Sequence, residues 1–378
     1  MSLGINLTLL IGQNTPRPAP SNLIEAFKSA EITHSDDGYS GFQITFHVGR
    51  AGKDNLLDYK LIKNPLIAVY NRVILIINLG AKAKLLMDGI ITHHQFSFSL
   101  TPGDSTFTIT GEDVSVMMDL EEKSVEHTAQ DEATIARVLI GNYAKYGLIP
   151  KVIAPSFRDQ PTRNERIPSQ QSTDLEYLKT IAQRFAYVFY ITPGPAIGQN
   201  TAYWGPPQRK DKPQKALTVN MESFSNVDSI SFQNNALSAT AVKGSIQDRK
   251  TNKIRPLQEY SSDRPSLAAQ PALARQAYRR TQQFRQTGRE TAQADALIQA
   301  IADRSVDNVV TVTGELDTIR YGTLLEARRL VGLRGVGATN DGLYYVKSVT
   351  HKISQGEYKQ NFTITRDGIG TTIQKLPI

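Results

Sequence analysis

Cysteine is absent from the 378-residue sequence. Disulfide frameworks, thiolate metal sites and cysteine nucleophiles are therefore excluded. Long hydrophobic runs are absent too, because the aliphatic run Val73–Ile77 is far shorter than the roughly 18 residues that a membrane-spanning helix needs. Residues 1–20 carry no positive charge before the apolar patch Leu7–Ile11, so a secretory signal is not expected either.

The composition is that of an ordinary globular protein, with 40% hydrophobic and 21% charged residues, and it excludes a disordered tail. At about 100–200 residues per domain, the length predicts two or three domains. The chain has 43 Lys and Arg residues against 36 Asp and Glu residues, which gives a net charge of +7. A moderately basic chain suits nucleic acid or an acidic partner, but net charge bears on association and not on the fold.

Residues 1–120 have the pattern of β structure. Phe42, Ile44 and Phe46 alternate with polar residues, which is typical of a half-buried strand. Further strands are expected at residues 7–11, 73–79, 85–91, 93–100 and 106–110. A short amphipathic turn over Val114–Leu120 follows, and this many strands with hardly a helix predicts a small antiparallel barrel or sandwich.

Residues 121–226 change to an α+β pattern. A capping box at residues 128–131 predicts a helix with its apolar stripe running from Ile135 to Tyr143 and its end at Gly147. A second capping box, Thr173 to Glu176, predicts another helix, and residues 187–192 then form a strand.

The last third returns to strands around an inserted segment. Strands are expected at residues 227–232, 237–245, 309–312, 324–333, 344–351 and 359–365. Between them, residues 248–305 are polar and basic, and end in a helical face of Ala294, Leu297, Ile298 and Ile301. The sequence has no internal repeat of the kind that builds a solenoid or propeller.

Six histidines do not favour a metal site. His93 and His94 are adjacent in a predicted strand, so their side chains point to opposite faces and do not chelate one ion together. The others lie far apart and form no HExxH or His-x-Glu motif; they are His34, His47, His127 and His351. No metal and no cofactor is predicted.

Other motifs of possible chemistry have simpler interpretations. The loop His34–Gly38 lacks the spacing and the terminal glutamate of an EF-hand, which favours a solvated turn. The glycines at 335 and 337 lead into a predicted strand and not into a helix, which favours a loop between strands over a phosphate loop. Glu121-Glu122 could serve glycoside hydrolysis, but 36 acidic residues offer many such pairs. No catalytic residue is predicted, and the chain is not expected to be an enzyme.

A basic segment lies between Asp248 and Glu290. It contains ten basic residues against four acidic ones: Arg249, Lys250, Lys253, Arg255, Arg264, Arg275, Arg279, Arg280, Arg285 and Arg289 against Asp248, Glu259, Asp263 and Glu290. Nucleic-acid binders collect cations in this way, but the segment has only three aromatic residues to interleave and matches no known nucleic-acid-binding motif. A solvated surface or a contact with an acidic subunit is the alternative, and in each case we expect the segment to be exposed.

One helix-then-strand segment is more specific. Residues 172–182 place Asp174 and Glu176-Tyr177-Leu178 ahead of Ala182, and the apolar stretch 185–190 follows. This pattern resembles a signature of the baseplate hub proteins of contractile tails, the phage late control protein D family. Relatives of that family include the hub of type VI secretion spikes and hubs of extracellular contractile injection systems. Ala186 stands where the family usually has glycine.

Four other segments agree with this family in the same order along residues 40–365: Phe107–Asp113, Ile135–Leu148, Leu217–Asn220 and Tyr344–His351. The resemblance implies two small tube-type β-barrels flanking an α+β domain. We therefore expect a first barrel at 1–120 and a middle domain at 121–226. A second barrel at 227–247 and 306–378 would be interrupted by a basic helical insertion at 248–305.

The resemblance also implies a function. Such hubs are structural: three copies form a ring that matches the hexameric inner tube above to the trimeric spike below and nucleates the tube. The expected partners are two further copies of the chain, the inner tube protein, the baseplate wedge proteins and a spike that is a separate polypeptide. The protein would be made in the cytoplasm and built into a contractile particle, whether of a phage, a type VI apparatus or another injection system.

Two other functions remain open from the sequence. A nucleic-acid-binding protein would act through the basic residues 248–290, and its affinity would fall steeply with salt. A cell-wall hydrolase would need a pair of acids or a metal site. The sequence assigns no residues to interfaces or to a channel.

Overall fold

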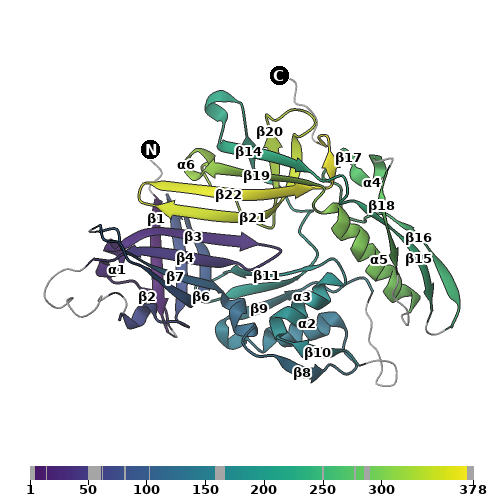
Figure 1. The fold of residues 1–378 in the computed structure, drawn as a ribbon, viewed down its shortest axis with the longest axis horizontal. Coiled ribbons are helices and arrows are strands. Elements are labelled where there is room, and N and C mark those ends of the chain that lie inside the picture. The colour runs from purple at the N-terminus through teal and green to yellow at the C-terminus, as the bar shows by residue number, and fades with distance from the viewer. Residues whose placement is uncertain are drawn as a thin grey trace.

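The largest sheet is mostly antiparallel and has 13 strands, which come from the amino-terminal and the carboxy-terminal parts of the chain (Figure 1). The structure is a computed structural model that describes residues 5–13, 15–49, 61, 63–80, 82–101, 103–157, 167–248, 251–275, 278–284 and 290–372. The main path of the sheet has the order β14-β19-β22-β21-β3-β4-β7-β6-β5-β1-β2, and β20 pairs with β21 and with β13. The mainly-β fold with α+β insertions that the sequence predicts is confirmed.

The amino-terminal part, which we call the first β unit, surrounds one hydrophobic core. Phe42, Ile44 and Phe46 are buried in it, as their period-2 spacing predicts, together with Ile32 and Phe107. The elements are β1 (Ile5–Gly12), β2 (Arg17–Pro18), α1 (Ser21–Glu25), β3 (Phe27–Ser35), β4 (Gly41–His47), β5 (Arg72–Leu79), β6 (Lys82–Ser97) and β7 (Thr106–Asp113).

The end of β6 differs from the prediction of a half-buried strand through Leu100. The ladder between β6 and β7 ends where Ser97 faces Thr106. Beyond that pair the chain leaves the sheet, so Phe98 and Leu100 are 63% and 92% exposed. Phe98 and Leu100 follow the alternating pattern, but the strand ends before them, so they do not reach a core.

The middle part packs two helices on a three-stranded sheet of order β11-β12-β9. The fully buried Trp204 lies in this core and donates from its indole nitrogen to the Leu178 carbonyl oxygen at 3.2 Å. The elements are β8 (Lys123–Glu126), α2 (Glu132–Gly141), β9 (Leu148–Val152), β10 (Ser169–Ser172), α3 (Asp174–Gln183), β11 (Val188–Pro193) and β12 (Asn200–Gly205).

The sequence predicts the start of α3 correctly, but its prediction for the start of α2 is wrong. Thr173 caps α3 as expected, because its hydroxyl accepts from the Glu176 amide at 3.2 Å. Helix α2 is capped by Asp131 and not by Thr128: the Asp131 carboxylate accepts from the Thr134 amide at 2.7 Å. This helix also ends at Gly141, and Gly147, at φ 83°, instead terminates the following 3-10 turn.

The carboxy-terminal strands form a second β unit with its own core. The elements after β12 are β13 (Gln214–Thr218), β14 (Val227–Asn234), β15 (Thr240–Gln247), β16 (Ile254–Tyr260), β17 (Gln270–Pro271), α4 (Ala272–Arg275), β18 (Arg280–Phe284), α5 (Thr291–Val306), β19 (Val310–Asp317), α6 (Thr318–Tyr321), β20 (Leu330–Arg334), β21 (Gly342–Ser354), β22 (Glu357–Arg366) and β23 (Gly368–Ile369). Leu217 and Val219 belong to this core, although the sequence placed them in the middle domain.

The inserted segment is not purely helical. Strand β15, predicted as part of the second barrel, pairs with β16 and β18 in a separate small sheet that α5 covers. Val242, Ile246 and Phe284 pack there against Ala294 and Ile298. This arm lies at the opposite end of the molecule from β1 and β2 (Figure 1). The polar composition concealed its strands, because only one face of a three-stranded sheet needs apolar residues.

Gly111 is expected to be essential to the first β unit. A Cβ atom at this position would overlap the Ile90 carbonyl oxygen and the Phe42 ring. Gly111→Ala should therefore lower the free energy of unfolding by about 1–3 kcal/mol, measured by urea denaturation. Gly141→Ala is the control, because its Cβ would meet no heavy atom within 4 Å and it lies in a helix. Equal stability of the two variants would contradict this prediction.

Candidate functional site at the joint between the β units

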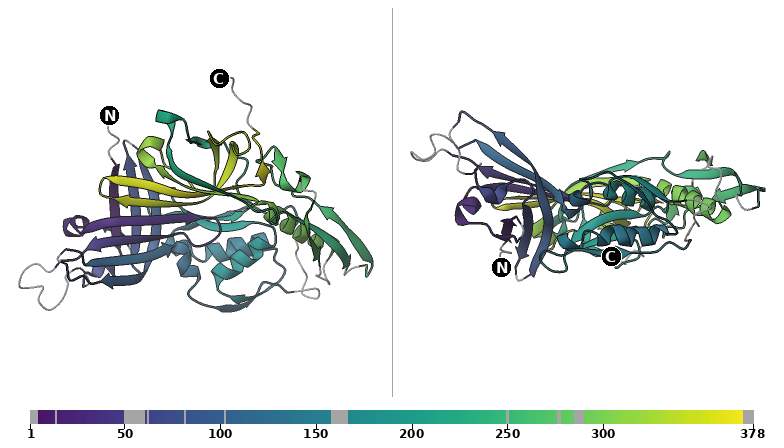
Figure 2. Two further views of the ribbon diagram at one scale, coloured as in Figure 1. Left: turned by 45° about the horizontal axis from the view of Figure 1, so that its top comes forward. Right: turned by 90° about the horizontal axis from the view of Figure 1, so that it is seen from below.

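The strands β3 and β21 join the two β units into one surface (Figure 2). Thr33 and Thr350 face each other across this joint, and their hydroxyl oxygens lie 2.9 Å apart. One face of the sheet is buried in the two cores. The other face is polar from β14 to β7 and carries Ser229, Ser231, Thr313, Glu315, Asn361, Thr363, Ser348, Thr350, Lys352, Ser29, Glu31, Thr33, Gln43, Thr45, Thr108 and Thr110.

We call this surface the polar face. It has no large apolar side chain, and its charged side chains include Glu31, Glu315 and Lys352, with Lys359 and Glu357 on the same face of β22. Lys359 lies 3.0 Å from the Glu315 carboxylate, and Lys352 faces Glu31 in the ladder. A shallow hollow lies over strands β14, β19, β22 and β21. Such a surface is suited to contact with water and not to burial against another protein core.

Arg328 holds the joint from the buried side. Its guanidinium donates to the Ser35 carbonyl oxygen at 2.7 Å and to the Ser40 hydroxyl at 2.7 Å, both in the first β unit. It also donates to the Ile191 carbonyl oxygen of the middle part at 2.8 Å. The Tyr190 ring lies 3.9 Å below the guanidinium carbon. One side chain therefore connects three parts of the chain.

A second arginine joins the first β unit to the middle part. The Arg72 guanidinium donates to the buried Asp88 carboxylate at 2.6 and 2.8 Å, and to the carbonyl oxygens of Tyr146 and Gly198 at 3.1 Å each. Asn200 donates to the same carboxylate at 3.0 Å. A buried charge that is paired and fully hydrogen-bonded is costly to disrupt, so this contact fixes the orientation of the two parts.

The family-like segment has a structural role that its residues explain. Asp174, at the start of α3, is fully buried. Its carboxylate accepts from Lys123 at 2.5 Å, from Gln170 at 2.7 Å and from Tyr143 at 2.8 Å. These contacts tie α3 to β8, β10 and the end of α2, so the acidic residue of the motif organises the middle part.

The histidines are not brought together as a metal site. His94 Nε2 donates to the Ile67 carbonyl oxygen at 2.6 Å, and His93 is exposed, so the two adjacent rings are separated as predicted. His47 is exposed, and His127 lies beside Gln170. Among the described residues, no group of three or more His, Asp or Glu residues could hold a metal ion.

His34 and His351 do meet, which the sequence analysis did not anticipate. Their ring centroids lie 5.7 Å apart across the joint, and the Tyr358 hydroxyl lies 2.7 Å from His351 Nδ1. Burial and, to a smaller extent, the charge of Lys84 lower the pKa of His351 to about 3. Burial, His351 and Arg328 likewise hold the pKa of His34 well below its usual value. The contact depends on the pairing of β3 with β21, in which Thr33 meets Thr350, 317 residues later in the sequence. Sequence patterns alone do not show that these two strands are neighbours.

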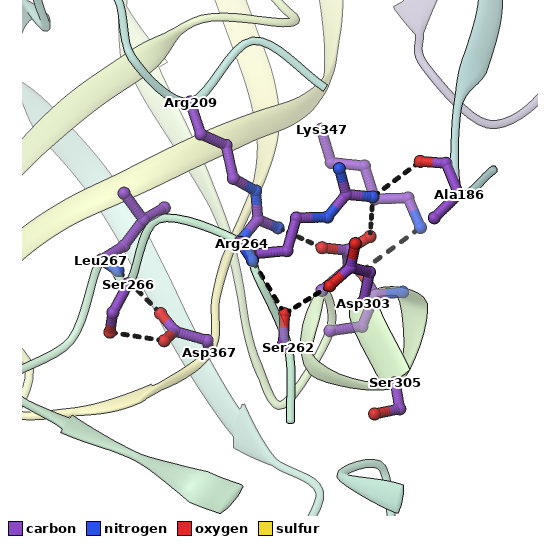
Figure 3. Close-up of polar contacts among 12 residues, drawn as sticks. Ala186, Arg209, Ser262, Arg264, Ser266, Leu267, Asp303, Ser305, Lys347 and Asp367 are labelled. Carbon is purple, nitrogen blue, oxygen red and sulfur yellow. Dashed lines mark hydrogen bonds and ion pairs between the residues drawn. The ribbon is translucent and has the colours of Figure 1, made fainter. Parts of the chain in front are cut away.

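The basic segment 248–290 is only partly exposed. Lys253, Arg255, Arg275, Arg279 and Arg280 lie at the surface. Arg264 does not: its side chain is 7% exposed and donates to the Asp307 carboxylate at 3.2 Å and to the Ala186 carbonyl oxygen at 2.7 Å (Figure 3). The expectation of a wholly exposed segment is wrong at this residue. Arg249, Lys250, Arg285 and Arg289 lie outside the described residues.

The remaining candidate motifs have structural roles or lie at the surface. In the loop His34–Gly38, Asp37 pairs with Lys347 at 3.2 Å, and burial raises the pKa of Asp36 to about 6. The loop that holds Gly335 connects β20 to β21, as expected. Glu121 and Glu122 are exposed. Within the described ranges, no helix is long and apolar enough to cross a membrane.

No protein-family model and no curated protein matches the sequence. Solved structures of similar fold do exist. A tail protein from Neisseria meningitidis aligns over 97% of this chain and 98% of its own length, with 12% identity and a TM-score of 0.65. The 43 kDa tail protein of a Shewanella oneidensis prophage aligns over 97% and 100%, with 12% identity and a TM-score of 0.63. The chain has a tail-protein fold.

A third structure extends the likeness to secretion systems. An Escherichia coli component of the type VI secretion system, described as structurally similar to bacteriophage T4 tail proteins, aligns over 90% of this chain and 73% of its own. Its identity is 9% and its TM-score 0.56. The resemblance to phage tail and type VI proteins that the sequence motifs predict is thus confirmed at the level of the fold.

In this tail-protein fold, Arg328→Met should destabilise the joint strongly. The variant leaves the Ser35 and Ile191 carbonyl oxygens without their donor, and each such loss costs about 1–3 kcal/mol. We expect the free energy of unfolding in urea to fall by about 3–5 kcal/mol. The neighbouring Arg329→Met is the control, since its side chain is half-exposed and forms an ion pair with Glu326. A fall of less than about 1 kcal/mol in both variants would show that Arg328 does not hold the joint.

The histidine pair predicts acid sensitivity. Both histidines bind protons more weakly in the folded than in the unfolded chain, so their contribution is complete above pH ~6.5 and is lost as the pH falls through their lowered pKa values, about 3 in the case of His351. The slope is up to about 1.4 kcal/mol per pH unit for each histidine. Asp36 acts oppositely: because its pKa is raised from 3.8 to about 6, its contribution is complete below pH ~3.8 and is lost as the pH rises to about 6.

The measurement is the free energy of unfolding between pH 5 and 7.5 for the wild type and two variants. His351→Gln should make the dependence on pH shallower, whereas His93→Gln, at an exposed position, should leave it unchanged. Identical slopes in all three proteins would rule out the buried histidines as the cause.

Proposed function

We propose that this chain is the structural hub of a contractile baseplate. Three copies would form a ring that joins a hexameric inner tube to a trimeric spike. The observation that carries the proposal is the continuous sheet: two β units in one chain share a single polar face across β3 and β21. Three chains of this kind supply six β units, which is how a trimer can match a hexamer.

The polar face supports a position on the inside of such a ring. Its side chains are mostly hydroxyls and amides, with charges of both signs in ion pairs such as that of Lys359 with Glu315, so it offers water a hydrated wall. The opposite face of the same strands is buried in the two hydrophobic cores. We therefore propose that the polar face lines the central channel.

The ends of the sheet support contact between copies. Among the described strands, β14 pairs only with β19, and the two-residue β2 ends the other side. The free edge of β14 presents backbone N–H and C=O groups that a neighbouring strand could pair with, and an unprotected edge is an aggregation hazard. Burial of these edges between copies would remove the hazard.

We propose the division of the chain that the sequence suggested, with two changes favoured by strand pairing. The first barrel is residues 1–120, the middle domain 121–226, the second barrel 227–247 with 306–378, and the insertion 248–305. Strand β13 joins the second barrel, and β15 joins the insertion. The partners would be the inner tube, the wedge proteins and a separate spike, and the chain would act by assembly in a contractile particle and not by catalysis.

The mass in solution tests the ring. We expect a species of about 125 kDa, three times 41.8 kDa, by light scattering behind a sizing column. Negative-stain class averages of that peak should show a ring with a central hole. A monomer at every protein concentration would contradict self-assembly into the hub.

The absence of cysteine allows a direct test of the channel wall. Thr313→Cys lies on the polar face and is exposed in a single chain. In the ring it should react with a small maleimide but only slowly with a large polyethylene glycol maleimide. Tyr278→Cys, on the arm and 94% exposed, should react with both reagents. Equal rates for both variants with the large reagent would place the polar face on the outside.

A further inference from the structure

A cavity of 240 Å³ lies where all parts of the chain meet. Asp36 comes from the first β unit, Lys179 and Arg209 from the middle part, Lys347 from the second β unit, and Arg304 from the end of α5. A water molecule takes up about 30 Å³ of the liquid, so the cavity has room for a polyatomic ligand.

Positive charge prevails around this cavity. Four cations line it, Lys179, Arg209, Arg304 and Lys347, against the three carboxylates of Asp36, Asp37 and Asp307. Two of the carboxylates are already engaged. Asp37 pairs with Lys347 at 3.2 Å, and Asp307 accepts from Arg209 at 2.7 Å and also from Arg264 at 3.2 Å. Asp307 therefore shares its single charge between two arginines.

Those two arginines are deeply buried and incompletely bonded. Their side chains are 2% and 7% exposed for Arg209 and Arg264. Arg209 Nε and Nη1 and Arg264 Nε have no hydrogen-bond partner among the described residues. Figure 3 shows Arg209, Arg264 and Lys347 converging on one region from three different segments of the chain. Buried donors without acceptors and a buried charge in excess both destabilise a protein.

We propose that this cavity is a binding site for a small oxyanion of the phosphate or sulfate type. Of the two arginines, Arg209 lines the cavity. Water would provide acceptors for its two unpartnered N–H groups, Nε and Nη1, but no negative charge, whereas an oxyanion provides both. Because its ligands come from the middle part, the insertion and the second β unit, the bound anion would hold these parts together. The site does not depend on the hub function proposed above, and its failure would leave the ring experiment unaffected.

Inorganic phosphate is the probe. At pH 7.5, replacing chloride by phosphate at constant ionic strength should raise the melting temperature of the full chain by at least ~2 °C. Calorimetric titration should give one phosphate per chain. No rise in melting temperature and no heat of binding with the wild type would overturn the proposal.

Variants locate the site. Arg304→Gln changes an exposed residue of the cavity wall and should weaken phosphate binding roughly tenfold without unfolding the chain. Arg275→Gln removes an exposed arginine elsewhere and should bind like the wild type. Asp36→Asn removes a carboxylate from the wall and should tighten binding. Wild-type affinity in both Arg304→Gln and Asp36→Asn would mean that phosphate binds elsewhere, and would overturn the assignment.

Discussion

Strand β21 pairs with β3 from Ser348 opposite Ser35 to Ser354 opposite Ser29, and the two β units become one sheet through this ladder. Long strands make the joint rigid, because β21 and β22 serve both cores. Ile353 and Tyr358 pack in the first core, while Val349 and Phe362 pack in the second. Neither unit can therefore turn relative to the other without breaking backbone hydrogen bonds and exposing apolar side chains.

Arginine holds the other parts to this sheet. Arg328 and Arg72 bind backbone carbonyl oxygens across part boundaries, and Arg264 reaches from the insertion to Asp307 and Ala186. The guanidinium offers five donors in a fixed plane, so one side chain can bind several segments at once. Burying these charges is costly, but the contacts fix the orientation of the parts that they join. The ring proposed above would require such a fixed orientation, since small errors in angle would prevent its closure.

The sequence motif that resembles tail proteins has a structural role, because its residues hold helix α3 in the middle part. Thr173 caps α3, and the buried Asp174 gathers Lys123, Gln170 and Tyr143. A residue type that is rarely buried unless it is well bonded leaves a recognisable trace in the sequence. Such a motif can therefore indicate the fold of this chain even though its sequence is only 9–12% identical to the known structures.

Local patterns determined the strands around Phe42, the cap at Thr173, the helical face at Ala294 and the separation of His93 from His94, because periodicity and capping act within a few residues. They failed at the tip of β6 and in the small sheet of β15, where pairing partners decide whether an apolar residue is covered. They also failed at the start of α2, where Asp131 and not Thr128 caps the helix. The sequence alone could not bring His34 to His351, bury Arg264 or create the cavity beside Arg209. Those features arise from contacts between residues tens to hundreds of positions apart, and only the tertiary structure decides which distant segments meet.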